Sequence, residues 1–326
     1  MTEFIRAVLN EATCPVCGSQ SDQLVDLAEP FLRQSLGQYF GETVSAAVEV
    51  GSYRLLRCRQ CTLEFASPMQ AGGSSFYHWI TAKPSYYPND RWEWGEVRNW
   101  LSKQSRPLRL LEVGCGSGAF LCSLKPIEHV NGVGLDTTAA SVVACHAKGL
   151  EVYDTPLEQI TIPSEQIPSA FDVIVAFHCL EHVPDPKGFI ASMVKLLKPG
   201  GRIFLSTPYS PMSFEHIWFD PLNHPPHHLS RWNKASFEEL AKQLDLSFSC
   251  LLAPASSFID RVLESLNLSI YGPQNLQRYR KLVSKVVSHP LLAGKAIVSQ
   301  LTRELVNGST AGNVVLVEYG CELPDS

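Results

Sequence analysis

The sequence predicts an α/β protein whose core is a doubly wound, mostly parallel sheet. From residue 93 onward, short apolar runs alternate with segments of helical periodicity, the order expected when helices cover both faces of such a sheet. Residues 171–177 form a nearly continuous apolar run, which is typical of a central strand buried on both faces. Two Cys-x-x-Cys pairs before this region and a helical stretch near its end predict an N-terminal metal-binding unit and a C-terminal helical insertion.

Composition narrows the classes of function. The chain has 326 residues, of which 45% are apolar and 18% are charged, enough for one large domain with additions or for two domains. A net charge of −5 argues against a general nucleic-acid binder. With no run of 18 apolar residues and no signal-peptide pattern at the start, the chain is expected to be cytoplasmic and to lack a membrane span. Its ten cysteines are then expected to be metal ligands or buried thiols.

The four cysteines of the N-terminal pairs have the type and spacing of a zinc site. Each pair can form a tight turn that presents two thiolates to one ion, and two such turns make a tetrahedral four-sulfur site. A bound zinc ion would be structural, because four thiolates leave no open position for a substrate. A redox pair is the alternative, although neither pair opens a helix in a strand–helix unit. The predicted ligands are Cys14, Cys17, Cys58 and Cys61.

The spacing of apolar residues and the residues that begin or end helices place the elements in order. Gly149 ends one helix, and Lys198-Pro-Gly-Gly ends another before a strand. A capping box at Ser236–Glu239 opens a later helix. Strands are expected at 44–50, 54–57, 63–65, 108–113, 130–136, 150–154, 171–177, 202–208, 246–253 and 313–319, and helices at 29–39, 93–102, 119–124, 138–148, 188–197, 236–244, 257–268, 276–287 and 291–306.

The stretch 110–120 changes from an apolar strand through a glycine turn into a helix. Gly114, Gly116 and Gly118 allow positive φ and the close approach of a ligand to the backbone. Amides of the turn and of the helix start, from Cys115 to Phe120, would point toward that ligand. The stretch therefore predicts a cofactor site, and a loop that merely turns is the alternative.

Glu112 narrows the class of cofactor. A P-loop would need Gly-Lys-Ser/Thr after the second glycine, which the sequence lacks, whereas a dinucleotide fingerprint tolerates Ala119 at its last position. A carboxylate two residues before Gly114 would repel a pyrophosphate and attract a cation. A cofactor that carries positive charge is therefore expected.

A second strand ends in Asp136, twenty residues after Gly116. At the carboxyl end of the neighbouring strand, this carboxylate, with Thr137 beside it, can accept hydrogen bonds from both hydroxyls of a ribose. Capping of the helix that follows is the alternative, and it is compatible with the same position.

In combination these motifs resemble the class I S-adenosylmethionine-dependent methyltransferases. They are Glu112-x-Gly114-x-Gly116-x-Gly118, the strand followed by His178-Cys-Leu-Glu-His-Val-Pro-Asp, and the Lys-Pro-Gly-Gly before the next strand. Cys-x-x-Cys-x-Leu-x-Phe followed by a Tyr-Tyr pair resembles the zinc-ribbon methyltransferases of natural-product and sugar pathways. The resemblance implies a Rossmann-like, seven-stranded sheet with one reversed strand, and S-adenosylmethionine as the cofactor.

The resemblance also implies roles for residues around that cofactor. Phe177 and His178 would carry backbone groups toward its amino end. Its adenine amine would meet Asp154 or the amide of Leu157, since Pro156, which has no backbone donor, stands where the family often has an acid. The aromatic segment 76–92 is expected to be a linker.

In the resembled family the aromatic segment often lies over the cofactor. Tyr86 or Tyr87 is accordingly a candidate contact to the methionine carboxylate of the cofactor or to the substrate, with Tyr86 taken as the cofactor-binding residue and Tyr87 as a candidate catalytic residue. A hydrophobic clasp between two domains is the alternative for both tyrosines.

Histidines supply the other candidates for a general base. Residues 209–232 form a long loop with five aromatic residues and four histidines, and it leaves the carboxyl end of a central strand, where ligands bind in open α/β sheets. His227 and His228 are the first candidates, followed by Tyr87 and His182. Ring packing within the loop is the alternative for the first two, and loop organisation for His182. A metal is not expected there, because no acidic or cysteine partner is spaced to complete a site.

The predicted organisation is a zinc ribbon at 1–75, a methyltransferase core at 93–253 and 308–326, and a helical insertion at 254–307. Apolar positions of the insertion recur at three and four residues, so one face needs a partner. Packing on the core or in a homodimer is favoured over a lid or a lipid contact.

The predicted function is methyl transfer to a small-molecule acceptor, as O- or C-methylation by in-line displacement. Nucleic acid is not expected as a partner. A zinc-ribbon scaffold with an inactive, cofactor-binding core is one alternative, and an NAD-dependent oxidoreductase is another.

Overall fold

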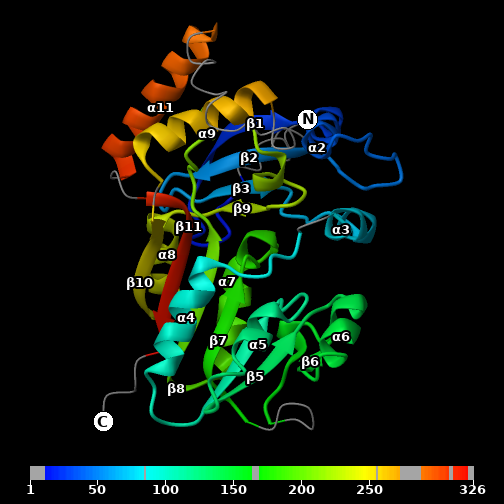
Figure 1. The fold of residues 1–326 in the computed structure, drawn as a ribbon, viewed down its shortest axis with the longest axis vertical. Coiled ribbons are helices and arrows are strands. Elements are labelled where there is room, and N and C mark those ends of the chain that lie inside the picture. The colour runs from blue at the N-terminus through cyan, green and yellow to red at the C-terminus, as the bar shows by residue number, and fades with distance from the viewer. Residues whose placement is uncertain are drawn as a thin grey trace, which may run out of the picture.

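The computed structural model describes residues 12–83, 86–163, 169–254, 256–271, 288–307 and 311–321. These residues form two sheets. The smaller is ordered β1 (Ser21–Leu27), β2 (Tyr53–Cys58), β3 (Glu64–Ser67) and β9 (Ser230–Arg231). The larger is ordered β10 (Ser247–Pro254), β11 (Ala311–Gly320), β8 (Leu197–Pro208), β7 (Phe171–Phe177), β4 (Leu108–Val113), β5 (Val130–Leu135) and β6 (Glu151–Tyr153). Figure 1 shows the smaller sheet above the larger one.

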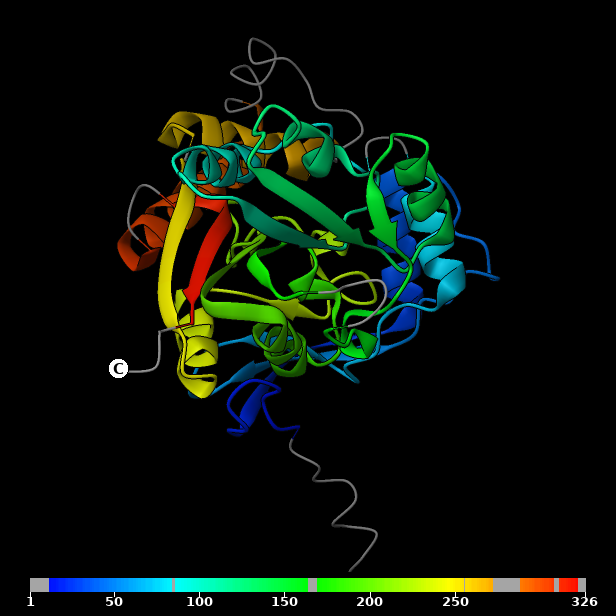
Figure 2. The ribbon, with the colours of Figure 1, turned by 90° about the horizontal axis from the view of Figure 1, so that it is seen from below.

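The larger sheet confirms the predicted fold class. Strands β8, β7, β4, β5 and β6 are parallel, and β11 runs antiparallel to both β8 and β10, so one strand is reversed. Helices cover both faces (Figure 2). Leu110 and Val173 pack with α4 (Trp92–Ser102), α5 (Ala119–Ser123) and α6 (Ala139–His146). Their chain neighbours Leu111 and Ile174 pack with α7 (Pro186–Leu196) and α8 (Lys234–Gln243) on the opposite face.

The smaller sheet departs from expectation at its first strand. The sequence predicts a strand at 44–50, but this segment is irregular, and residues 21–27 form the strand instead. The reason is exposure: β1 is an edge strand with exposed side chains over most of its length, including Leu24 and Val25. It therefore carries no apolar alternation. Val44 and Val48 are buried without belonging to a strand.

The aromatic segment is also more ordered than the expected linker. Helix α3 (Ser74–Thr81) occupies its first part. Phe76 and Ile80, four residues apart on one face, are fully buried in the apolar cluster that also holds Leu32 and Leu36 of α2 (Glu29–Phe40). The helix is thus packed onto the smaller sheet.

The loop at 209–232 joins the two sheets. Its end forms β9, which pairs with β3 of the smaller sheet through Glu64 and Phe65. The amide of Ala66 also donates to the Leu229 carbonyl at 2.8 Å. Leu56, Leu63 and Phe65 then share one apolar cluster with residues of α7 and α8. The N-terminal unit and the core are therefore continuous in their packing.

The helix after this loop begins earlier than its predicted capping box. Asn233 is the N-cap residue of α8, and its side chain accepts from the Ser236 amide while the Ser236 hydroxyl bonds back to Asn233. Ser236 is thus the third residue of the helix, and the prediction that it opens the box was wrong by three positions. Asn and Ser form the reciprocal pair, where the sequence pattern suggested Ser and Glu.

The helical insertion contains α9 (Phe258–Tyr271) and α11 (Pro290–Asn307). Val262 and Leu266 of α9 pack against Ala293 and Ala296 of α11. The helix expected at 276–287 lies outside the described residues, as does the start of the chain. Among the helices of the described ranges, none combines the length and the apolarity needed to cross a bilayer.

Candidate functional site

A cavity of about 960 Å³ lies where β4, β5 and β7 end. Its lining includes the last residues of those strands, Val113, Leu135 and Phe177. The glycine turn, the aromatic segment and the histidines of the 209–232 loop complete the lining. In open α/β sheets this edge is where ligands bind, because loops from several strands converge there.

The glycine turn is shaped for close approach. All three glycines have positive φ. At Gly116, where φ is +50°, a Cβ would lie 2.7 Å from Cε1 of Tyr87. A side chain would therefore clash as well as strain the backbone. The turn exposes main-chain groups to the cavity, as the sequence predicts.

Asp136 is fixed by two backbone donors. Its Oδ2 accepts from the Gly116 amide at 2.8 Å, and its Oδ1 accepts from the Thr138 amide at 2.9 Å. The N-cap residue of α6 is Thr138, so Asp136 orients the turn without occupying the capping position. Each carboxylate oxygen has a further lone pair, and Asp136 and Thr137 both line the cavity. The carboxylate can thus accept from two ligand hydroxyls.

Glu112 is a buried carboxylate beside the turn. It is 4% exposed, and its Oε2 has no hydrogen-bond partner among the described residues. Burial and the nearby Asp136 charge raise the pKa of Glu112 well above its usual range, although the Leu121 amide acts in the opposite direction. A buried carboxylate without full compensation is costly, and a cationic ligand group would relieve that cost.

The two tyrosines contact different parts of the cavity lining. Tyr87 covers Gly116 of the turn. Tyr86 instead places its hydroxyl 3.3 Å from Nε2 of His227, and its ring meets that of Tyr87 edge-on at 5.0 Å. Tyr87 thus lies beside the glycine turn, and Tyr86 lies beside the histidines.

His178 lies between two acids that sequence reasoning did not assign to the site. Its Nε2 is 3.1 Å from Glu93 Oε1, and its Nδ1 is 3.4 Å from Glu181 Oε1. Burial opposes the charged ring, but the carboxylates of Glu181 and Glu93 outweigh it and raise the pKa of His178. Glu93, which is 1% exposed, could have been noticed as an acid between the two tryptophans of the first core helix.

Three histidines gather in the lining of the same cavity. His182, His227 and His228 each place a ring nitrogen within 4.8 Å of those of the other two. Burial and the neighbouring His182 lower the pKa of His227 to about 3. Burial likewise lowers the pKa of His182 and, well below its usual range, that of His228. All three rings are therefore neutral at pH 7, which makes each a weak base in this state.

The remaining predicted residues divide between the cavity and its surroundings. Leu157 and Cys115 line the cavity, but Asp154 is exposed and lies outside the lining. Phe120 is fully buried behind the turn, with its ring 4.8 Å from that of Phe177. Gly118 is the left-handed N-cap of α5.

Comparison with known proteins agrees with this geometry. Residues 90–250 match the sequence model of a family described as a methyltransferase domain. The region 90–250 of this chain is therefore similar to a methyltransferase domain. The ubiquinone biosynthesis O-methyltransferase of Aeromonas salmonicida is 33% identical over 117 residues, 33% of this chain and 48% of that protein. The protein of the same name from Idiomarina loihiensis is 40% identical over 104 residues, 30% of this chain and 42% of that protein.

The likeness to these relatives is confined to one region. The chain spans a little under half the length of the curated relatives that it matches. Among solved structures, an S-adenosylmethionine-dependent methyltransferase from Archaeoglobus fulgidus is similar over 70% of this chain and 92% of that one, with 14% identity and a TM-score of 0.47.

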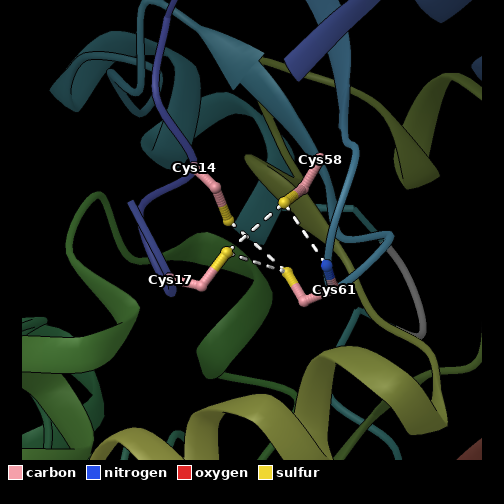
Figure 3. A group of neighbouring side chains, drawn as sticks. All are labelled: Cys14, Cys17, Cys58 and Cys61. Atoms are coloured by element: carbon pink, nitrogen blue, oxygen red, sulfur yellow. Dashed lines mark hydrogen bonds between the residues drawn. The ribbon is translucent and has the colours of Figure 1, made fainter. Parts of the chain in front are cut away.

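A cluster of four cysteines lies at the turn after β2. Figure 3 shows the sulfur atoms of Cys14, Cys17, Cys58 and Cys61 converging from the two Cys-x-x-Cys turns. Three of the sulfur–sulfur distances are 3.4, 3.5 and 3.8 Å. A tetrahedral zinc ion with bonds of about 2.3 Å would hold sulfurs about 3.8 Å apart. Amides of Gln60 and Cys61 also point at the Cys58 sulfur, which favours a thiolate. The residues therefore fit a structural zinc ion.

Glu112→Gln offers a test of the buried carboxylate in the methyltransferase domain. A carboxyl whose pKa is raised by folding costs stability as pH rises through that pKa, so the variant should melt at a higher temperature than wild type at neutral pH. The affinity of wild type for S-adenosylmethionine should respond to rising pH in the opposite direction from its stability. In wild type it should increase as pH rises and Glu112 ionises, while the glutamine variant should bind more weakly and with a flatter pH profile. Calorimetric titrations between pH 5 and 8, with melting curves, measure both.

Equal affinities of the two proteins across this pH range would show that Glu112 does not face the cationic part of the cofactor.

Proposed function

We propose that the chain transfers the methyl group of S-adenosylmethionine to a small-molecule acceptor by O- or C-methylation. One observation carries the proposal: the same cavity is lined by the glycine turn with Asp136 and by the tyrosine and histidine cluster with Tyr86 and His227. A donor and an acceptor can therefore lie side by side in it, which is what a bimolecular transfer needs.

The cofactor side of the proposal follows from charge and hydrogen bonding. Asp136 would accept from the ribose hydroxyls, Glu112 would face the cationic end, and the glycine turn would lie along the ligand between them. Phe177 and His178, at the end of β7, would offer backbone groups to the amino end. Residues 155–158, which include Leu157, line the cavity, whereas Asp154 does not. We therefore assign the adenine contact to Leu157 and no longer to Asp154.

The acceptor side lies around Tyr86, His182, His227 and His228. The relatives named ubiquinone biosynthesis O-methyltransferases support an oxygen as the acceptor atom. S-adenosylmethionine supplies an already activated methyl group when it is bound. The tasks left to the chain are to align the acceptor, exclude water and remove a proton. We reverse the two tyrosine roles, with Tyr87 over the cofactor and Tyr86 toward the acceptor.

Three further features belong to this proposal. A structural zinc ion would be bound by the four N-terminal cysteines. The protein would work in the cytoplasm, where its thiols stay reduced; all ten of its cysteines are free.

A homodimer would bury the apolar side chains that α11 exposes, such as Leu291 and Val298, which are 83% and 62% exposed. Light scattering across a concentration series should then report a mass twice that of the monomer, and a constant monomer mass would exclude this dimer.

Methyl transfer is tested by two measurements on the purified chain. Calorimetry should show binding of S-adenosylmethionine and none of NAD; binding of NAD alone would favour the oxidoreductase. Transfer of radiolabelled methyl groups to a panel of phenols, sugars and enolisable ketones should then show turnover with one class. Cofactor binding without turnover on any member of the panel would favour the scaffold.

A further inference from the structure

The three histidines that line the cavity come from two separate parts of the chain. His182 ends the short 3₁₀ turn Leu180–His182 after β7, whereas His227 and His228 belong to the 209–232 loop. Their ring centroids are 4.5 to 4.8 Å apart. The loop alone offers no complete set of metal ligands, but the fold adds a third imidazole to its two.

Each of the three rings is held by a hydrogen bond at Nδ1. His182 Nδ1 is 2.7 Å from the His227 carbonyl, His227 Nδ1 is 2.9 Å from the Leu222 carbonyl, and His228 Nδ1 is 3.0 Å from Oδ1 of Asn223. A carbonyl oxygen can only accept, so the proton of each neutral ring sits on Nδ1. The lone pair is then on Nε2 in all three rings. This is the arrangement by which proteins fix the tautomer of metal-binding histidines.

A buried acid beside the cluster shares its neighbour His178 with a second buried acid, Glu93. Glu181 is 1% exposed, and neither of its carboxylate oxygens has a hydrogen-bond partner among the described residues. Its Oε1 lies 4.0 Å from His228 Nε2 and 3.4 Å from His178 Nδ1, both long for hydrogen bonds. A cation held by the histidines would offset the cost of burying this charge.

We propose that His182, His227 and His228 bind a divalent transition-metal ion of the zinc type on the acceptor side of the cavity. Three imidazoles favour zinc and its neighbours over magnesium or calcium. Three protein ligands also leave a coordination position open, and all three residues line the cavity. Metal–nitrogen bonds of about 2.1 Å require the rings to draw together by roughly 1 Å, and Tyr86 to release His227 or become a ligand itself.

The metal site rests on the proposed methyl transfer and gives its acceptor a chemical class. An acceptor hydroxyl bound at the open position would lose its proton to solvent more readily, because a metal lowers the pKa of a bound O–H group. Its oxygen would then form the new carbon–oxygen bond as the carbon–sulfur bond breaks, with that electron pair remaining on sulfur. Neutral histidines would thus act as ligands and need not act as bases. Acceptors with a phenolic or enolic hydroxyl are expected.

The stoichiometry of metal binding tests the site directly. Wild-type protein dialysed against Zn²⁺ and then against metal-free buffer should retain two equivalents per chain, one for the four cysteines and one for the histidines. With Co²⁺, the first site should show sulfur-to-metal charge-transfer absorption, and the second should add only visible bands. Retention of one equivalent by wild type, with charge-transfer bands alone, would overturn the proposal without any variant.

Two variants and a matched control locate the second ion. His182→Gln and His228→Gln should each retain one equivalent and lose at least about 100-fold in turnover, in line with the several kcal/mol expected of a catalytic metal. His216→Gln, which changes an exposed histidine of the same loop, should retain two equivalents and full turnover. Two equivalents in both cluster variants, with circular dichroism like wild type, would contradict the assignment.

Cofactor titration separates this proposal from the proposed function. All of these variants should bind S-adenosylmethionine as wild type does, since the glycine turn and Asp136 are unchanged. Loss of the metal site with turnover intact would leave a methyltransferase that works without this ion. No binding of S-adenosylmethionine by wild type would refute the proposed function, whatever the metal count.

Discussion

Replacing Asp136 with alanine is expected to weaken the binding of S-adenosylmethionine by at least about 100-fold. In the proposed function Asp136 would accept from two ribose hydroxyls, and each hydrogen bond to a carboxylate contributes about 1.5–3 kcal/mol. Together they exceed about 3 kcal/mol, which corresponds to two decades in the dissociation constant. It also removes the acceptor that holds the Gly116 amide. Calorimetric titration with S-adenosylmethionine and with its demethylated product measures the effect.

Asp154→Ala is the matched control for this prediction. Asp154 follows the next strand of the sheet, as Asp136 follows its own, but it is exposed and outside the cavity lining. Its replacement should leave the affinity within about twofold of wild type. Asp136→Asn, which keeps the size and one acceptor, should bind with intermediate affinity. An unchanged affinity in Asp136→Ala, or a loss shared by Asp154→Ala, would show that the cofactor lies elsewhere.

Cys58→Ser is expected to abolish binding of the zinc ion proposed for the four cysteines and to damage turnover more than cofactor binding. Cys58 is 1% exposed and belongs to the apolar cluster that α7 and α8 share. Loss of the ion should loosen the smaller sheet. The histidine loop depends on that sheet, because β9 pairs with β3 and the Arg231 guanidinium lies 3.3 Å from Glu64. Turnover should fall at least tenfold, whereas the affinity for S-adenosylmethionine should stay within about threefold.

Metal analysis, near-ultraviolet circular dichroism and steady-state kinetics measure the consequences of Cys58→Ser. Cys250→Ser changes a half-buried cysteine on β10, outside the metal cluster, and should match wild type in all three. Full zinc content in Cys58→Ser would argue against the four-sulfur site. A parallel loss of cofactor affinity and turnover would argue against the selective link between the smaller sheet and the histidine loop.

Local sequence patterns were sufficient to predict the core of the molecule. The glycine turn, the acid at Asp136 and the apolar run of β7 each lie within a short window, and their chemistry depends on neighbours in the chain. The same holds for the two Cys-x-x-Cys turns, since the identity of the residues and their spacing define the ligand set. These patterns predict the doubly wound sheet, its reversed strand and the edge at which the cavity lies.

Local patterns failed where a residue's environment comes from distant segments. Strand β1 has no alternation because it is an exposed edge, and β9 is only two residues long. The packing of α3 depends on α2, far earlier in the chain. Tyr86 and Tyr87 are adjacent, so the sequence could assign either one to either side of the cavity.

The sequence by itself determined the fold class, the edge of the sheet at which the cavity lies and the cluster of four cysteines, because these depend on periodicity, glycine and cysteine spacing over short distances. Only the tertiary structure decided that His182 joins His227 and His228, that Glu181 is buried beside them, and that β9 ties their loop to the smaller sheet. The physical reason is that these contacts join residues 45 or more positions apart. The hydrogen bond between His182 and the His227 carbonyl, and the burial that accompanies it, lie beyond any local window of the sequence.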